Sequence, residues 1–242
     1  MKRVLILLGI LSICVSAGLF YLGVKARTSG LPIFSSYYII NSKMFGEPMD
    51  IRSWVTPNEP SIKEVAKGLQ TEDKIAMVTK TYNWLEENYH YDSDDWVILN
   101  NGRIIIKGGT DSWALPVFTL AQKHQNGSIY VDCEDGTFIL VSLLRSLGIE
   151  AYANIGTVSL NGSIYGHAWG TVIIDGKEYL LETTLGVELT ELRPVPSFYK
   201  TDVKFNEKDV IAITGVDINK EIYPPLPPAK IQDLKDALNS AN

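Results

Sequence analysis

The stretch Tyr130–Gly148, with the sequence YVDCEDGTFILVSLLRSLG, constrains the fold of this chain more than any other segment. Its apolar residues between Phe138 and Leu144 cover nearly every face of a helix, which is typical of a helix buried on all sides. Gly148 is expected to cap the helix, because glycine readily takes the left-handed conformation that ends many helices. The chain must therefore fold around this helix, and Cys133 lies in its first turn.

Cys133 has two interpretations. The first backbone N–H groups of a helix lack intrahelical partners, and they lower the pKa of a cysteine beside them by favouring the thiolate. In that case Cys133 is a nucleophile. Free cysteine is also among the residue types most often buried in a core, so a purely structural Cys133 is the alternative.

Composition excludes several kinds of partner and cofactor. The 242 residues carry a formal net charge of −6 and no basic cluster beyond the N-terminus, which argues against a nucleic-acid partner. The two cysteines, Cys14 and Cys133, are too few for the usual four-ligand zinc site. We therefore expect no metal ion and no other cofactor.

The N-terminus predicts a membrane segment. Lys2 and Arg3 precede an apolar run of 21 residues, Val4–Val24, and a spanning helix needs about 20. We expect residues 1–27 to be an uncleaved transmembrane anchor that holds the remainder of the chain outside the cytoplasm. The alternative is a cleaved signal peptide and a secreted protein, although signal-peptide cores are usually only about 7–15 residues long.

Two helices are predicted before the Cys133 helix. Residues 28–60 contain repeated proline and glycine, so we expect a linker that wraps onto the following domain. Ser61 to Glu64 fits a capping box that opens a short helix to about Leu69. A second helix starts at Thr71 and has one apolar face, formed by Ile75, Val78, Tyr82, Leu85 and Tyr89.

After the Cys133 helix the apolar pattern changes to a period of two, which is typical of β-strands. We predict strands over residues 149–159, 165–174 and 178–184. The dipeptides Asn161-Gly162 and Asp175-Gly176 join them, and both favour two-residue hairpin turns. A smaller hairpin is expected around residues 100–102, and a closing helix carries Ile231, Leu234 and Leu238 on one face.

His167 and Glu182 are the candidate partners of Cys133. A thiol nucleophile needs a base, and the base is usually oriented by a carboxylate. With a two-residue turn after Ile174, His167 and Glu182 become diagonal neighbours on one face of the sheet, with Cβ atoms about 7–8 Å apart. The other histidines, His90 and His124, have no such neighbour in the sequence.

Several motifs resemble the transglutaminase-like superfamily. They are DSWALP at 111–116, CED at 133–135, SLLRSLGI at 142–149, HAW at 167–169 and LETT at 181–184. The resemblance spans roughly residues 72–186. It implies a papain-like core, in which a cysteine-bearing helix packs on an antiparallel sheet that supplies a histidine and an acid. By position, Cys133 is the nucleophile, His167 the general base and acid, and Glu182 the orienting acid.

Two residues depart from the family pattern. Val131 stands where the family usually has glycine, two residues before the cysteine, and Glu182 stands where the third member is usually aspartate.

The Cys133 backbone N–H is one oxyanion donor. The second is left open among Trp113, Gln125 and Asn126.

The expected protein is an α+β domain, with a transglutaminase-like core over residues 61–188 and a C-terminal extension over residues 189–242. The resemblance implies cysteine-dependent acyl transfer on amide bonds through a thioester. We expect hydrolysis of a peptide or protein amide rather than crosslinking, mainly because no metal site is evident. The alternative is a non-catalytic transglutaminase-like module that binds peptide or glycan at the cell surface.

Overall fold

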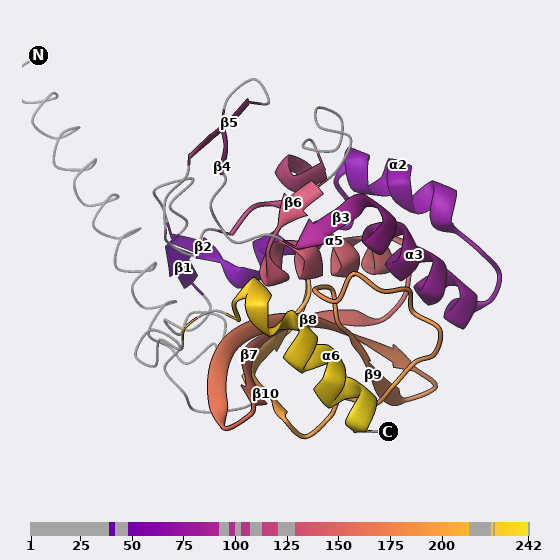
Figure 1. Cartoon of the computed structure of the whole chain (residues 1–242). Helices are drawn as coiled ribbons and strands as arrows, with labels where there is room; N and C mark the ends of the chain where they lie inside the picture. The colour runs from indigo at the N-terminus through magenta and orange to yellow at the C-terminus, as the bar shows by residue number, and fades with distance from the viewer. Residues whose placement is uncertain are drawn as a thin grey trace, which may run out of the picture.

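The computed structural model describes residues 39–41, 48–91, 97–99, 103–106, 113–120, 129–212, 224 and 226–241. These residues form an α+β fold with helices on both faces of one five-stranded antiparallel sheet (Figure 1). The strand order is β11-β10-β7-β8-β9. In chain order the strands are β7 (Ala151–Leu160), β8 (Ser163–Ile174), β9 (Lys177–Leu181), β10 (Tyr199–Phe205) and β11 (Val210–Ala212).

Helix α5 (Cys133–Ser146) is the centre of the main core, as the sequence predicts. Six of its apolar side chains have no exposed surface: Phe138, Ile139, Leu140, Val141, Leu143 and Leu144. It packs on β7 and β8, and α2 (Pro60–Leu69) and α3 (Lys74–Asn88) pack against it. The predicted glycine cap is confirmed, since Gly148 has φ 78° and the Ile149 N–H donates to the Leu144 carbonyl at 2.9 Å.

The starts of α2 and α3 differ from the prediction. Pro60 is the first residue of α2 and Glu59 precedes it, so Ser61 lies inside the helix and forms no capping box. Proline explains this start, because its fixed φ suits the first helical position. In α3, Asp73 is the cap and its Oδ1 accepts from the Ala76 N–H at 2.7 Å. Ile75 is exposed and does not share the buried face.

The two tight hairpins form where the sequence predicts them. The turn residues Asn161-Gly162 have φ 50° and 79°, and Asp175-Gly176 have φ 50° and 74°. Positive φ at both positions is the geometry of the hairpin turn that these dipeptides favour. Ile174 accordingly pairs with Lys177. This register sets which residues of β8 and β9 share a face.

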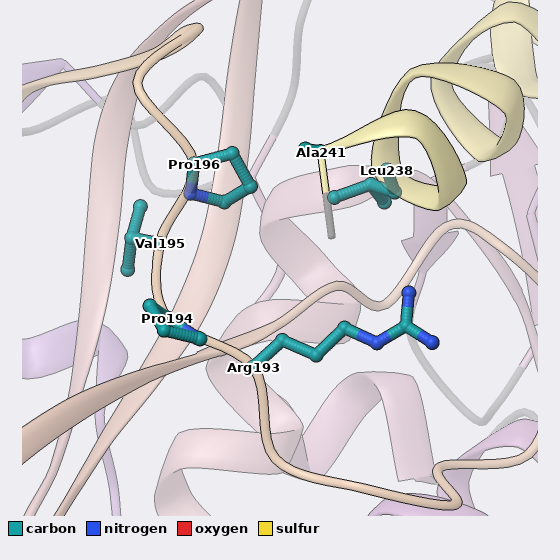
Figure 2. Close-up of a pocket in the computed structure, with 6 residues that line it drawn as sticks. All are labelled: Arg193, Pro194, Val195, Pro196, Leu238 and Ala241. Atoms are coloured by element: carbon teal, nitrogen blue, oxygen red, sulfur yellow. The ribbon is translucent and has the colours of Figure 1, made fainter.

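Helix α6 (Ile231–Ser240) covers the face of the sheet opposite α5 and follows the short helix η4 (Pro228–Lys230) (Figure 1). A second apolar cluster lies beneath it: Val158, Leu160, Trp169, Leu180, Tyr199, Leu226, Leu234 and Leu238. At its far end a cavity of about 220 Å³ is lined by Arg193, Pro194, Val195, Pro196, Leu238 and Ala241 (Figure 2). None of the predicted site residues lines this cavity.

Three smaller sheets complete the described structure. β1 (Ile39–Asn41) pairs with β2 (Pro48–Asp50), which leads into the short helix η3 (Ile51–Trp54). The predicted hairpin is confirmed as β4 (Val97–Leu99) and β5 (Arg103–Ile106). β3 (Tyr89–Tyr91) pairs in parallel with β6 (Ile129–Val131), and this pairing holds the end of α3 beside the start of α5.

The predicted membrane segment, residues 1–27, lies outside the described residues. Among the helices that the structure describes, none combines the length and the apolar character needed to cross a membrane.

Gly136, in the first turn of α5, is required by close packing. An alanine Cβ at this position would lie 2.5 Å from Tyr89 Oη, and the same hydroxyl donates to the Asp132 carbonyl. We expect Gly136→Ala to lower the free energy of unfolding by about 1–3 kcal/mol, as overpacked core substitutions do. Urea denaturation measures the change. Gly68→Ala is the matched control, because nothing lies within 4 Å of its Cβ; it should raise stability by about 0.5–1 kcal/mol.

Candidate active site

Cys133 is the first residue of α5 and lies against the middle of β8 and the residues that follow β9. Its Sγ donates to Glu134 Oε2 at 3.2 Å, and the Ala168 backbone N–H of β8 donates to the sulfur. The Cys133 carbonyl accepts from Thr183 Oγ1 at 3.5 Å. The thiol is therefore fixed beside the residues that directly follow His167 and Glu182 in the sequence.

The environment of the thiol contradicts the expected low pKa. Burial raises the pKa of Cys133 well above its ordinary value, and the charges of Glu134 and Asp132 and the hydrogen bond to Glu134 raise it further. Only the Ala168 N–H acts in the opposite direction. Loss of water and two neighbouring carboxylates thus outweigh the favourable helix N-terminus. The resting sulfur is a protonated thiol.

Glu134→Gln tests this account of the thiol. Removing the carboxylate charge should lower the pKa of Cys133, so that iodoacetamide alkylates it severalfold faster at pH 7. The measurement is the alkylation rate as a function of pH, followed by mass spectrometry of the Cys133 peptide. Glu188→Gln, at an exposed position, is the control and should leave the rate unchanged. An unchanged rate in Glu134→Gln would show that burial and Asp132, and not Glu134, set the pKa of Cys133.

His167 and Glu182 form a buried pair, as the hairpin register predicts. His167 Nε2 lies 2.9 Å from Glu182 Oε2, and the exposed fractions of the two side chains are 0% and 3%. Pairing of β8 with β9 ends at Gly170 and Leu181, so Glu182 is the first residue beyond the paired strand. The chain leaves the ladder there, and the carboxylate reaches back across the face to the histidine.

Both oxygens of Glu182 are held by further donors. Oε1 accepts from the Thr184 N–H at 3.1 Å and from Thr184 Oγ1 at 2.8 Å, while Oε2 also accepts from the Tyr199 hydroxyl at 2.7 Å. Burial alone would raise the pKa of Glu182, but the charge of His167 and these hydrogen bonds outweigh it, and the pKa is lowered from 4.5. Glu182 is therefore a carboxylate at neutral pH.

Tyr199 is the residue of this site that sequence reasoning misses. It lies on β10, and its ring contacts Trp169 at 4.9 Å and His167 at 6.2 Å between centroids. The alternation of Tyr199, Val203 and Phe205 would have marked a strand, but nothing in the sequence points to a contact with Glu182. The Trp169 ring also stacks on the His167 ring, with 6.1 Å between the centroids.

The remaining nitrogen of His167 is the reactive one. Glu182 holds Nε2, and a carboxylate partner fixes the proton on that nitrogen and leaves Nδ1 as the acceptor. Nδ1 is buried and has no hydrogen-bond partner among the described residues. The His167–Glu182 pair is thus assembled, while the Cys133 thiol donates its hydrogen bond to Glu134.

The other candidate residues lie elsewhere. Trp113 packs its ring on Trp54 and Phe138 in the main core, with centroid distances of 5.7 and 5.1 Å. Gln125, Asn126 and His124 lie outside the described residues, and His90 is an exposed residue of β3. Within the part of the chain that the structure describes, no cluster of histidine, cysteine and acidic side chains is arranged to hold a metal ion.

Part of the chain matches a known protein family. Residues 63–181 match the family model of the transglutaminase-like superfamily. This region belongs to the transglutaminase-like superfamily. The transglutaminase-like match includes Cys133 and His167 but ends one residue before Glu182, and Tyr199 lies beyond it.

Several solved structures are similar to the chain, and two of them are described here. A protein from Cytophaga hutchinsonii described as a candidate cysteine protease shows 17% identity and a TM-score of 0.41, covering 67% of this chain and 50% of that one. This chain therefore spans about half the length of the Cytophaga protein. LapG of Legionella pneumophila shows 16% identity and a TM-score of 0.44, covering 64% of this chain and 76% of LapG. No curated protein sequence matches the chain.

Proposed function

We propose that this transglutaminase-like protein performs cysteine-dependent acyl transfer on amide bonds, with peptide hydrolysis as its reaction. The observation that carries the proposal is the buried His167–Glu182 pair, whose Nδ1 has no hydrogen-bond partner among the described residues. A buried imidazole held by an ionised carboxylate is the arrangement that accepts a proton from a nucleophile and stabilises the resulting cation.

The reaction follows from the roles of three side chains. His167 Nδ1 takes the proton of Cys133, and the sulfur attacks the carbonyl carbon of the substrate amide. The carbon–nitrogen bond breaks, the amine leaves with the proton from His167, and an acyl group remains on sulfur as a thioester. His167 then takes a proton from water, the hydroxide displaces the sulfur, and the carboxylic acid leaves as the thiol is restored. Glu182 stabilises the protonated His167 in both halves.

The raised pKa of Cys133 places a condition on the first step. The thiol hydrogen-bonds to Glu134 at rest, so it must turn from Glu134 to His167 Nδ1 before its proton can move. Formation of the thiolate is therefore coupled to substrate binding, and the free protein is protected from indiscriminate alkylation.

Trapping of the thioester tests the proposal. The full chain is mixed with a library of synthetic peptides, quenched in acid after seconds, and digested for mass spectrometry. An acyl group on Cys133, together with newly formed peptide carboxyl termini, is the expected result. Cys133→Ser protein is the control and should accumulate no thioester. Absence of both adduct and cleavage across the library would contradict the proposed reaction.

A non-catalytic binding module is the second candidate, and one observation favours it. Cys133 is only 6% exposed and burial raises its pKa, which are also properties of an inert structural thiol. The two functions differ in the response to a bound peptide. A catalytic Cys133 becomes alkylated faster when the peptide releases it from Glu134, whereas an inert thiol is protected by the same ligand.

We also propose that residues 1–27 anchor the protein in a membrane, with the domain acting on peptide or protein substrates outside the cytoplasm. The support is the apolar run Val4–Val24 in the sequence. Membrane fractionation of the full chain tests the anchor. If the anchor is present, only detergent should extract the protein from the membrane fraction. A mature protein that begins near Gly18 or Arg27 would replace the anchor by a cleaved signal peptide.

A further inference from the structure

The outer edge of β8 is covered only in part by β9. The two strands pair from Ile174 with Lys177 to Gly170 with Leu181, so the earlier residues of β8 extend beyond β9. Strand β7 pairs with the opposite edge of β8 along its length. Alternate residues of a strand direct their N–H and C=O groups to the same edge. The backbone groups of Gly166, Ala168 and Gly170 therefore point to this outer edge.

Two other parts of the chain use that edge. The Ala168 N–H donates to the sulfur of Cys133. At the adjacent position, the Gly166 N–H donates to the Pro224 carbonyl at 2.9 Å and the Gly166 carbonyl accepts from the Leu226 N–H at 3.1 Å. Such a reciprocal pair of bonds is how one strand adds to another. Because alternate residues lie about 6.6–6.8 Å apart along a strand, the added segment runs next to the thiol.

The segment is held in place from both sides, and we call Pro224, Leu226 and α6 together the strap. Leu226 is buried in the apolar cluster with Trp169 and with Leu234 of α6. The Tyr91 hydroxyl donates to the Leu226 carbonyl at 2.7 Å. Because Leu226 hydrogen-bonds to Gly166, the residue directly before His167 on β8, this clamp lies beside the site.

The position of the strap explains why the site is closed. Figure 1 shows α6 lying across one face of the sheet. Trp169, two residues after His167 on β8, packs in the apolar cluster with α6, and the His167 side chain has no exposed surface. A peptide that approached Cys133 along β8 would need the same backbone groups of Gly166 that Pro224 and Leu226 already use.

We propose that the edge of β8 at Gly166 binds the backbone of an extended peptide, and that the strap fills this site in cis as a competing ligand. The ligand class is a peptide with an apolar side chain flanked by prolines, as in the chain's own YPPLPP at residues 223–228. Proline favours an extended backbone in advance and so reduces the entropy lost on binding. Edge addition supplies the backbone bonds, and the apolar pocket vacated by Leu226 supplies selectivity. This inference names a ligand of the Cys133–His167 site, and it therefore rests on the proposed function.

Binding is tested without turnover, in full-length Cys133→Ala protein. The probe is a fluorescein-labelled synthetic peptide with the sequence YPPLPPA, followed by fluorescence anisotropy. Leu226→Asp puts a charge into the apolar cluster and should release the strap. A peptide that competes with a cis ligand gains apparent affinity as the free edge becomes more populated. We expect at least tenfold tighter binding than to the Cys133→Ala parent. Ile211→Asp, at an exposed position of β11, is the matched control and should bind like the parent.

A milder variant covers the case in which Leu226→Asp does not fold. Tyr91→Phe removes only the hydroxyl that clamps the Leu226 carbonyl. Loss of one such hydrogen bond should tighten peptide binding about fivefold and, with Cys133 present, speed its alkylation by a similar factor. Tyr152→Phe is the control, because its hydroxyl bonds to Glu150 at an exposed position, and it should change neither quantity.

The outcomes separate this inference from the proposed function. Equal peptide affinity in the parent and in folded Leu226→Asp and Tyr91→Phe proteins would overturn the inference, even if wild-type protein cleaves other peptides. If circular dichroism shows that Leu226→Asp protein is unfolded, the peptide affinity of Tyr91→Phe protein alone tests the inference. Tighter binding in the released variants supports the inference, and it does so even if no thioester forms on Cys133.

Discussion

Replacing Cys133 by alanine is expected to abolish amide turnover while the fold is retained. No other thiol lies in the described residues, so none of them could replace Cys133 as the carrier of the acyl intermediate. Loss of the nucleophile in comparable enzymes lowers kcat by roughly 10⁶-fold, which places the variant at the limit of detection. Alanine is only slightly smaller than cysteine, and the free energy of unfolding should fall by about 1 kcal/mol. Peptide cleavage and urea denaturation, measured on the same preparation, give both quantities.

The control for this prediction is Cys133→Ser, which places a hydroxyl group where the thiol was, at the first position of α5. It should be as inactive as the alanine variant, because a serine hydroxyl is a much weaker nucleophile without a matched environment. Turnover that survives in purified Cys133→Ala protein would remove Cys133 from the mechanism and leave the binding module as the better account.

Glu182→Gln is expected to produce the second-largest loss of turnover, and it should also lower the free energy of unfolding. The amide keeps the shape of the side chain but removes the charge that stabilises protonated His167, so kcat should fall by about 10²–10⁴-fold. The buried donors of His167, Tyr199 and Thr184 also lose their charged acceptor. Breaking a buried charged pair in this way lowers the free energy of unfolding by about 3–5 kcal/mol.

The pH dependence of the Glu182 contribution has a definite sign. The pKa of Glu182 is lowered in the folded protein, so its contribution to stability is present above the ordinary value of 4.5 and is lost as pH falls through the folded value. The difference in unfolding free energy between parent and Glu182→Gln should therefore be largest at neutral pH and shrink in acid. Urea titrations over this range measure it.

Glu178→Gln is the matched control on the same strand. Glu178 pairs with Lys204 at 2.5 Å near the surface, where such pairs contribute at most about 1 kcal/mol. We expect unchanged kcat and no comparable dependence on pH. If Glu182→Gln kept the kcat of the parent, Glu182 would be a structural residue and His167 would need another orienting group.

The sequence predicts local and hairpin geometry well because these depend on neighbours. The apolar residues of α5 cover nearly every face of the helix, which predicts that it is buried. Asp175-Gly176 predicts a two-residue turn, and the length of this turn fixes the register of β8 against β9. Extending that register past Leu181 brings Glu182 near His167, although Glu182 itself lies beyond the paired strand. These are contacts between segments that are close in sequence, where residue type and spacing contain enough information.

Contacts between distant segments are the ones that the sequence does not reveal. Tyr199 reaches Glu182 from β10, and Tyr91 reaches Leu226 across 135 positions of the chain. The pKa of Cys133 is a further example. A helix N-terminus is visible in the sequence and lowers a thiol pKa, but the stronger opposing effects, burial and the orientation of Glu134, exist only in three dimensions.

The two-residue turn at Asp175-Gly176 also limits how relatives of this protein can diverge. Surface turns are usually the places where a lineage gains or loses residues without penalty. Here one inserted residue would move Glu182 to the other face of the sheet, away from His167, and would also exchange Leu180 and Leu181 between the two apolar clusters that they fill. Relatives that keep the His167–Glu182 pair should therefore differ at this turn by even numbers of residues.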